Sequence, residues 1–168
     1  MATAAAMIWS VGLLPGAEFH AVWGSDAELT LPWTGDRPRS PAWFPPEGGL
    51  RFGFFTLPPD SPMNASEPPL DAAFAELAQK LPGLLERLEM DNPGRHTTDT
   101  VDFIHIVSGE VWLEVEDGAQ TRLVAGDCVC VVQNGTCHAW WNKSNEPCTK
   151  AVAMIGVCRS TSDTQPPD

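Results

Sequence analysis

Two histidines and an aspartate in one β-branched run are the residues of this sequence whose types and spacing could perform chemistry. The stretch "GRHTTDTVDFIHIVSG" contains His96, Asp102 and His105. In an extended strand alternate side chains share a face, so His96 and Asp102 would point to one side and His105 to the other. Imidazole and carboxylate groups on one face can bind a metal ion or transfer a proton. The run therefore predicts a metal site or an acid–base site, unless these residues only support the fold.

A second group of polar and aromatic side chains follows the Asn-Gly turn of "NGTCHAWWN". His138, Trp140 and Asn142 share one face if this stretch is a strand. If it lies beside the first run, His138 converges with His96 and Asp102, and we predict these three as catalytic residues and metal ligands. The expected substrate contacts are Thr98, Trp112, Trp140 and Asn142.

Structural roles are the alternative interpretation of each of these residues. His96, next to a Gly-Arg turn, could be a surface histidine, and His138 could be a core histidine bonded to Asp102 or water. Trp112 and Trp140 could simply pack in the core. His20, in "AEFHAVW", could lie at the barrel mouth as an acid or base, or could belong to an ordinary edge strand.

Turn signals divide the chain into four segments of one domain. Residues 1–69 are rich in proline and tryptophan, and we expect an arm that packs on the rest, with strands in "AEFHAVW" and "GLRFGFFTL". Residues 70–93 have apolar side chains at helical spacing, which Pro82-Gly83 should break into two short helices. Residues 94–159 alternate short β-branched runs with Gly turns, which is typical of an antiparallel sandwich or small barrel. Residues 160–168 are polar and should fray.

The two runs together resemble the paired motifs of the cupin family. The first motif, G(X)5HXH(X)3-4E(X)6G, is matched by His96, Asp102 in place of Glu, and Gly109, with Thr98 where the second histidine stands. In the second, G(X)5PXG(X)2H(X)3N, the matching residues are Gly126, Gly135, His138 and Asn142, with Gln133 near the proline position after one extra residue. This resemblance covers residues 94–158. It implies an all-β cupin jelly-roll barrel, a double-stranded β-helix, with the Pro/Trp-rich arm and one or two short helices added.

The resemblance also implies a site for a divalent metal, since cupins with the full motif hold one through three histidines and a glutamate. Here His96, Asp102 and His138 would form a two-histidine, one-carboxylate set, which suits Fe(II) and tolerates Zn, Mn or Ni. Thr98 supplies only a weak neutral oxygen, and aspartate is shorter than glutamate. A metal-free site is therefore the alternative.

Composition limits the partners that we expect. The 168 residues contain 10 Lys and Arg against 22 Asp and Glu, a formal charge of −12, which opposes nucleic acid and anionic membranes. The apolar start "MATAAAMIWSVGLLPGA" has no basic n-region, so we interpret it as mature protein rather than a signal peptide. Five cysteines without a CxxC pair indicate buried free thiols in a cytoplasmic protein. The Pro-rich arm could cover or exchange a sheet edge, which favours a homodimer.

Three functions are consistent with this pattern. The first is an enzyme of small-molecule metabolism, acting on a polyketide-like or aromatic carbonyl compound by non-redox lyase, dehydratase, isomerase or cyclase chemistry. This prediction also uses the resemblance, because cupins with a degraded first motif resemble proteins encoded beside such pathways. The second is an Fe(II)-dependent dioxygenase, and the third is a non-catalytic protein that binds a small molecule.

Overall fold

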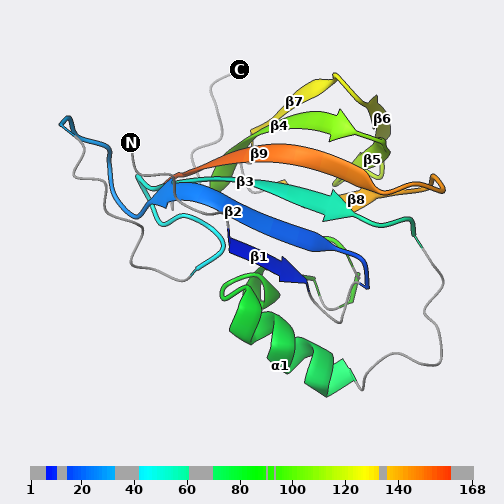
Figure 1. The fold of residues 1–168 in the computed structure, drawn as a ribbon, viewed down its shortest axis with the longest axis horizontal. Coiled ribbons are helices and arrows are strands. Elements are labelled where there is room, and N and C mark those ends of the chain that lie inside the picture. The colour runs from blue at the N-terminus through cyan, green and yellow to red at the C-terminus, as the bar shows by residue number, and fades with distance from the viewer. Residues whose placement is uncertain are drawn as a thin grey trace.

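Two antiparallel sheets face each other across a common interior. The computed structural model describes residues 7–10, 15–32, 42–60, 70–89, 91–92, 94–132 and 136–159. Within these ranges one sheet has the strand order β1-β2-β3-β9-β4-β7 and the other the order β6-β5-β8, and all neighbouring strands are antiparallel (Figure 1). The predicted β-rich barrel with short helices is confirmed.

The strands after β1 follow the predicted runs closely, whereas β1 was not predicted. Their bounds are β1 Met7–Ser10, β2 Glu18–Ser25, β3 Leu50–Leu57, β4 Thr100–Ser108, β5 Glu110–Val115, β6 Gln120–Val124, β7 Cys128–Val132, β8 His138–Trp141 and β9 Cys148–Gly156. The predicted Asn-Gly turn at 134–135 and the predicted frayed tail at 160–168 lie outside the described residues.

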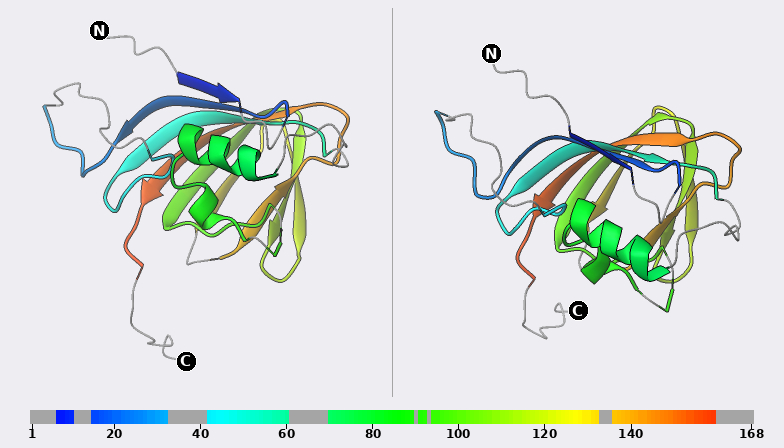
Figure 2. Two further views of the ribbon diagram at one scale, coloured as in Figure 1. Left: turned by 90° about the horizontal axis from the view of Figure 1, so that it is seen from below. Right: turned by 60° about the horizontal axis from the view of Figure 1, so that its bottom comes forward.

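The helical segment breaks at Pro82-Gly83, as predicted. Helix α1 spans Leu70–Lys80, and a short 3-10 helix, η1, spans Leu85–Arg87. The intervening Gly83 has a φ of +89°, a conformation that suits glycine. Leu77 and Leu81 pack with Ala17 and Phe19 in a second apolar cluster below β2, so α1 covers one side of the six-stranded sheet (Figure 2).

The strands predicted near the N-terminus belong to the six-stranded sheet itself. Strand β3 pairs with β9 along its whole length, from Leu50 opposite Ile155 to Leu57 opposite Cys148. Gly53 permits the close pairing with β2, because a Cβ at this position would lie 2.4 Å from the carbonyl oxygen of His20. The N-terminal segment therefore extends the sheet that carries β4 and β9.

Strict alternation along β4 separates the two faces of this sheet. Thr100, Asp102 and Ile104 are buried, whereas Phe103 and His105 are exposed. The predicted outward orientation of His105 is confirmed, and its Nδ1 lies 3.3 Å from Cys128 Sγ. The inward residues Ile104 and Ile106 join the main core cluster between the two sheets.

The prediction of buried thiols is wrong for three of the five cysteines. Cys137 and Cys148 are buried, but Cys128, Cys130 and Cys158 are exposed. On β7 Val129 and Val131 occupy the inward positions, so alternation places Cys128 and Cys130 on the outer face. In the part of the chain that the structure describes, no helix has the length and apolar character needed to cross a membrane.

Candidate active site

His96 and His138 lie side by side at the interior end of β8. They form an antiparallel bridge in which each backbone N–H donates to the other residue's carbonyl, at 3.0 and 3.1 Å. Their ring centroids are 4.2 Å apart. The two motifs, far apart in the sequence, therefore meet as predicted for these two residues.

Both imidazoles are held in the neutral form. The ring Nδ1 of His96 donates to the carbonyl of Gly94 at 3.2 Å, which leaves Nε2 as an acceptor. Burial lowers the pKa of His96 to about 4, and the charge of Lys150 adds to this effect. Burial also lowers the pKa of His138 to about 3, with contributions from His96 and Lys150. Two neutral rings can accept a proton or a metal ion, or orient a ligand.

Asp102 enters the same interior from β4. Its side chain is 6% exposed, and its Oδ1 has no hydrogen-bond partner among the described residues. Burial raises the pKa of Asp102 to about 6, although a hydrogen bond with Thr100 and the charge of Lys150 act in the opposite direction. A buried carboxyl group with an unpaired oxygen is unusual in a folded protein and favours a functional role.

Lys150 is the fourth ionisable group of this interior. It is 4% exposed, and its Nζ lies 3.4 Å from the ring centroid of Trp140 and 5.1 Å from that of Phe55. Burial lowers the pKa of Lys150 to about 7, while the negative charges of Cys148 and Asp102 partly offset this shift. Near neutral pH the lysine therefore exchanges between ammonium and free amine.

The sequence interpretation missed Lys150, although the sequence carries a signal for it. In "CTKAVAMIG" the residues at even positions are Cys148, Lys150, Val152, Met154 and Gly156. Lys150 therefore has the same parity as apolar residues that a buried strand face would contain. A lysine at this position means either that the assumed strand face is wrong or that the lysine is buried. In the structure Lys150 is buried.

The other predicted substrate contacts lie in different surroundings. Trp140 faces the interior, with its ring 6.2 Å from that of His138 in an edge-on arrangement. Thr98 is buried, with Oγ1 2.8 Å from Oγ1 of Thr100. Asn142 is fully buried and donates to the carbonyls of Leu57 and Glu146, which joins the end of β3 to the segment before β9.

Trp112 and His20 are not brought to this interior. Trp112 alternates with the buried Val111 and Leu113, and its ring lies below the cations of Arg122 and Lys143 on the outer face of the smaller sheet. His20 alternates with the buried Phe19 on β2, and its Nε2 lies 3.0 Å from a carboxylate oxygen of Glu18.

The described residues fit a three-ligand metal centre only in part. The tautomer of His96 leaves a free acceptor nitrogen, as a metal ligand requires. However, no group of three or more His, Cys, Asp and Glu side chains able to hold an ion is found in the described ranges. The positive charge of Lys150, which acts on both histidines and on Asp102, also opposes a divalent ion. Metal binding by His96, Asp102 and His138 stays a prediction.

Comparisons with known proteins agree with this architecture. The Cupin_2 family model, described as a cupin domain, matches residues 88–153. The Aspergillus oryzae protein "Oryzines biosynthesis cluster protein J" is 42% identical over 60 residues, which are 36% of this chain and 32% of that protein. The chain thus spans about a third of the length of this curated relative.

Two solved structures are similar at low sequence identity. A sugar phosphate isomerase from a cupin superfamily of Silicibacter pomeroyi is 12% identical, with a TM-score of 0.45 over 90% of this chain and 68% of that chain. A Cupin 2 conserved barrel domain protein from Salinispora arenicola is 11% identical, with a TM-score of 0.44 over 83% of this chain and 75% of that one. The four ionisable residues that meet between the sheets all lie within residues 88–153, and this part of the chain is a cupin domain.

Proposed function

We propose that this protein is an enzyme of small-molecule metabolism that moves protons on a carbonyl-bearing substrate without redox chemistry. Lyase, dehydratase, isomerase and cyclase reactions all share this step. The observation that carries the proposal is the enclosure of Asp102 and Lys150 in one interior, with pKa values moved towards neutrality from opposite sides. Pairs of groups shifted in this way supply a base and an acid at the same pH.

Each group has a distinct role in the proposed reaction. The Asp102 carboxylate, with its unpaired Oδ1, removes a proton from the carbon next to the carbonyl. The Lys150 ammonium stabilises the negative charge that develops on the carbonyl oxygen. His96 and His138 remain neutral and orient the substrate, while the rings of Trp140 and Phe55 provide an apolar wall.

The Aspergillus oryzae relative supports a role in small-molecule metabolism but does not identify the substrate. That relative is named as a protein of a biosynthesis cluster. A hydroxylated or aromatic carbonyl compound fits the aromatic wall around Lys150. The Fe(II)-dependent dioxygenase and the non-catalytic binding protein stay alternative predictions.

Proton exchange with solvent tests this proposal without knowledge of the natural substrate. Acetophenone and cyclohexanone are incubated with the full-length protein in D2O, and loss of the α-proton signal is followed by NMR. We expect exchange above the buffer rate that falls by at least about 100-fold in Asp102→Asn, which keeps the shape of the side chain but removes the base. His105→Ala, on the outer face of the same strand, should leave the rate unchanged. Exchange no faster than in buffer, or insensitive to Asp102→Asn, would overturn the proposal.

A further inference from the structure

Lys150 occupies a position between the two sheets that a structural lysine rarely takes. It lies on β9, opposite Phe55 of β3 on one side and Ile106 of β4 on the other. Its Nζ reaches across to Trp140 on β8, in the other sheet. The amine is therefore held near the middle of the interior, by strands on both sides and an aromatic ring in front.

The charge of this lysine is not neutralised by a direct ion pair within the described residues. No carboxylate among them lies within 4 Å of its Nζ, whereas Lys80, for example, pairs with Glu76. The two aromatic faces attract a cation but do not replace the water that the ammonium loses. A lysine in such a place readily becomes a neutral amine, which is the nucleophilic form.

We propose that the Nζ of Lys150 joins the carbonyl carbon of the ligand as an imine. This inference rests on the proposed function and deepens it, because it assigns the substrate class as an aldehyde or ketone and gives Lys150 a covalent role in place of charge stabilisation at the carbonyl oxygen. A protonated imine withdraws electrons from the adjacent carbon, so it makes the α-proton that Asp102 removes more acidic. The imine thereby serves the purpose that a metal ion serves when it polarises a carbonyl.

The step is balanced by groups already in the interior. The nitrogen lone pair of the neutral amine attacks the carbonyl carbon, a C–N bond forms, and the carbonyl π electrons move to oxygen. A proton passes from nitrogen to that oxygen, giving a carbinolamine. The protonated carboxyl of Asp102 then donates a proton to the hydroxyl group, and water leaves as the C=N bond forms. Amine, carbonyl and the protonated carboxyl of Asp102 thus give a protonated imine, water and the Asp102 carboxylate, and no oxidant or reductant is consumed.

Reductive trapping on the full-length protein tests this inference. The chain has three lysines, Lys80, Lys143 and Lys150, so peptide mapping can resolve them. The protein is incubated at pH 7 with benzaldehyde and sodium cyanoborohydride, which reduces an imine to a stable benzylamine. We expect one benzyl group per chain on Lys150, formed at least ten times faster than on the other two lysines. An ordinary lysine, with a pKa of about 10.4, has roughly one free amine in a few thousand at this pH.

Lys143 offers a matched control, because it also lies over a tryptophan ring but is exposed. Lys143→Met should keep the label, and Lys150→Met should lose it. Mapping of the unmodified protein needs no variant, so the test holds even if Lys150→Met does not fold. The N-terminal α-amine, with a pKa of about 8, also reacts at pH 7 and is mapped separately. Equal labelling of all three lysines, or labelling of Lys80 or Lys143 without Lys150, would overturn the inference.

The trapping and exchange experiments separate this inference from the proposed function. Trapping at Lys150 without ketone exchange would support the imine and contradict the acid–base function. Exchange that depends on Asp102 without trapping at Lys150 would support the function and overturn the imine.

Discussion

The six-stranded sheet buries several polar side chains on its inner face and exposes several large apolar side chains on its outer face. On the inner face β4 and β9 bury Thr100, Asp102 and Lys150. On the outer face the same strands present Phe103, Val107 and Ile155 to the surface. Buried polar groups and exposed large apolar groups are the two informative departures from the usual pattern, and here they lie back to back.

The buried ionisable groups of the inner face lower the stability of the fold. Burial disfavours the charged forms of both Asp102 and Lys150, and apolar residues of similar size would avoid that cost. Their presence in this interior is what the proton-transfer role proposed above requires.

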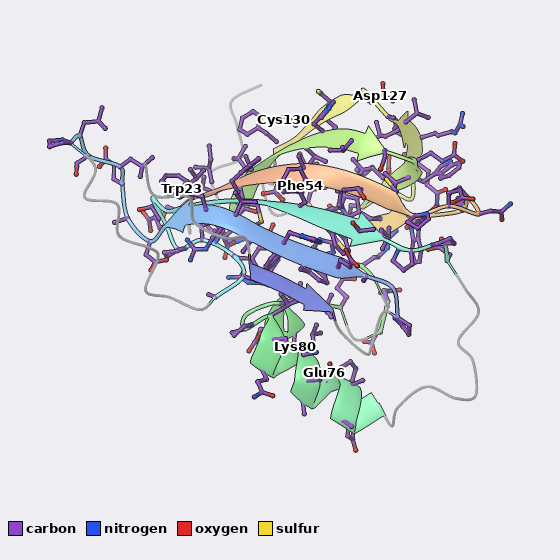
Figure 3. The ribbon with its side chains drawn as sticks, viewed as in Figure 1. Trp23, Phe54, Glu76, Lys80, Asp127 and Cys130 are labelled. Carbon is purple, nitrogen blue, oxygen red and sulfur yellow. The ribbon has the colours of Figure 1, made fainter. Side chains whose placement is uncertain are left out.

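The outer face has an apolar surface. Trp23, Phe54 and Cys130 all extend from the side of the sheet that faces the viewer in Figure 3. A groove that crosses β3, β9, β4 and β7 is lined by Phe52, Phe103, Cys128 and Cys130, among others. This surface is where a homodimer, as the sequence predicts, could bury apolar area.

The largest difference between the two faces should appear in neighbouring residues of β4. Ile104→Ala removes a side chain that is 4% exposed and should lower the free energy of unfolding by about 2–5 kcal/mol. Phe103→Ala, at a position 50% exposed, should cost less than about 1 kcal/mol. Urea denaturation measures both. Equal costs would show that Phe103 is buried in solution, as it would be between two copies of the chain.

The predicted metal site on the inner face can be strengthened by restoring the family pattern. Thr98→His adds an imidazole beside His96 and His138, and should tighten zinc binding by about 10–100-fold, as measured by calorimetry. Circular dichroism would check that the larger side chain does not unfold the barrel. The same affinity in the variant and the unmodified protein would show that position 98 does not converge with the two histidines on an ion.

Burial of Lys150 should make stability depend on pH. Its pKa falls from 10.5 to about 7 on folding, so between pH 7 and 8.5 the unfolded chain binds more protons than the folded one. The free energy of unfolding should therefore rise with pH, by up to about 1.4 kcal/mol per pH unit. Above that range the raised pKa of Cys148 acts in the opposite direction.

Two lysine variants separate this effect from other titrations. Lys150→Met should flatten the rise between pH 7 and 8.5, whereas Lys143→Met, at an exposed position, should retain it. Denaturant titrations at three pH values measure the slopes. A slope that survives Lys150→Met would place the titrating group elsewhere.

The smallest expected effect is a difference in thiol reaction rates, which reports directly on whether the outer face is covered. Cys158 is exposed and provides an internal reference, while Cys128 and Cys130 lie on the outer face. If the predicted homodimer forms through this face, Cys128 and Cys130 should react with a thiol reagent several-fold more slowly than Cys158, because the partner covers them. Phe103→Asp should then equalise the rates and give a monomer in sedimentation. Equal rates before the substitution would exclude this face as the dimer interface.

The sequence by itself determined the strands after β1, the helix break and the strand faces on which the two histidines lie. Alternation of side chains in "VDFIHIV" and "CHAWW" is a local property of an extended chain, so it predicts which residues share a face. It also placed His105 outside and Asp102 inside, as the structure has them. Proline and glycine restrict or free the backbone locally, so Pro82 and Gly83 also predicted the end of α1.

Only the tertiary structure decided which faces meet. Parity assigned Lys150 to the face of Cys148 and Met154, but the approach of Trp140 from the other sheet depends on how the two sheets pack. Likewise Trp112 and Trp140 share a plausible role in the sequence, yet one lies on the outer face of the smaller sheet and the other in the interior. The orientation of a strand face towards the core depends on long-range pairing, here of β5 with β6 and β8, which no local pattern encodes.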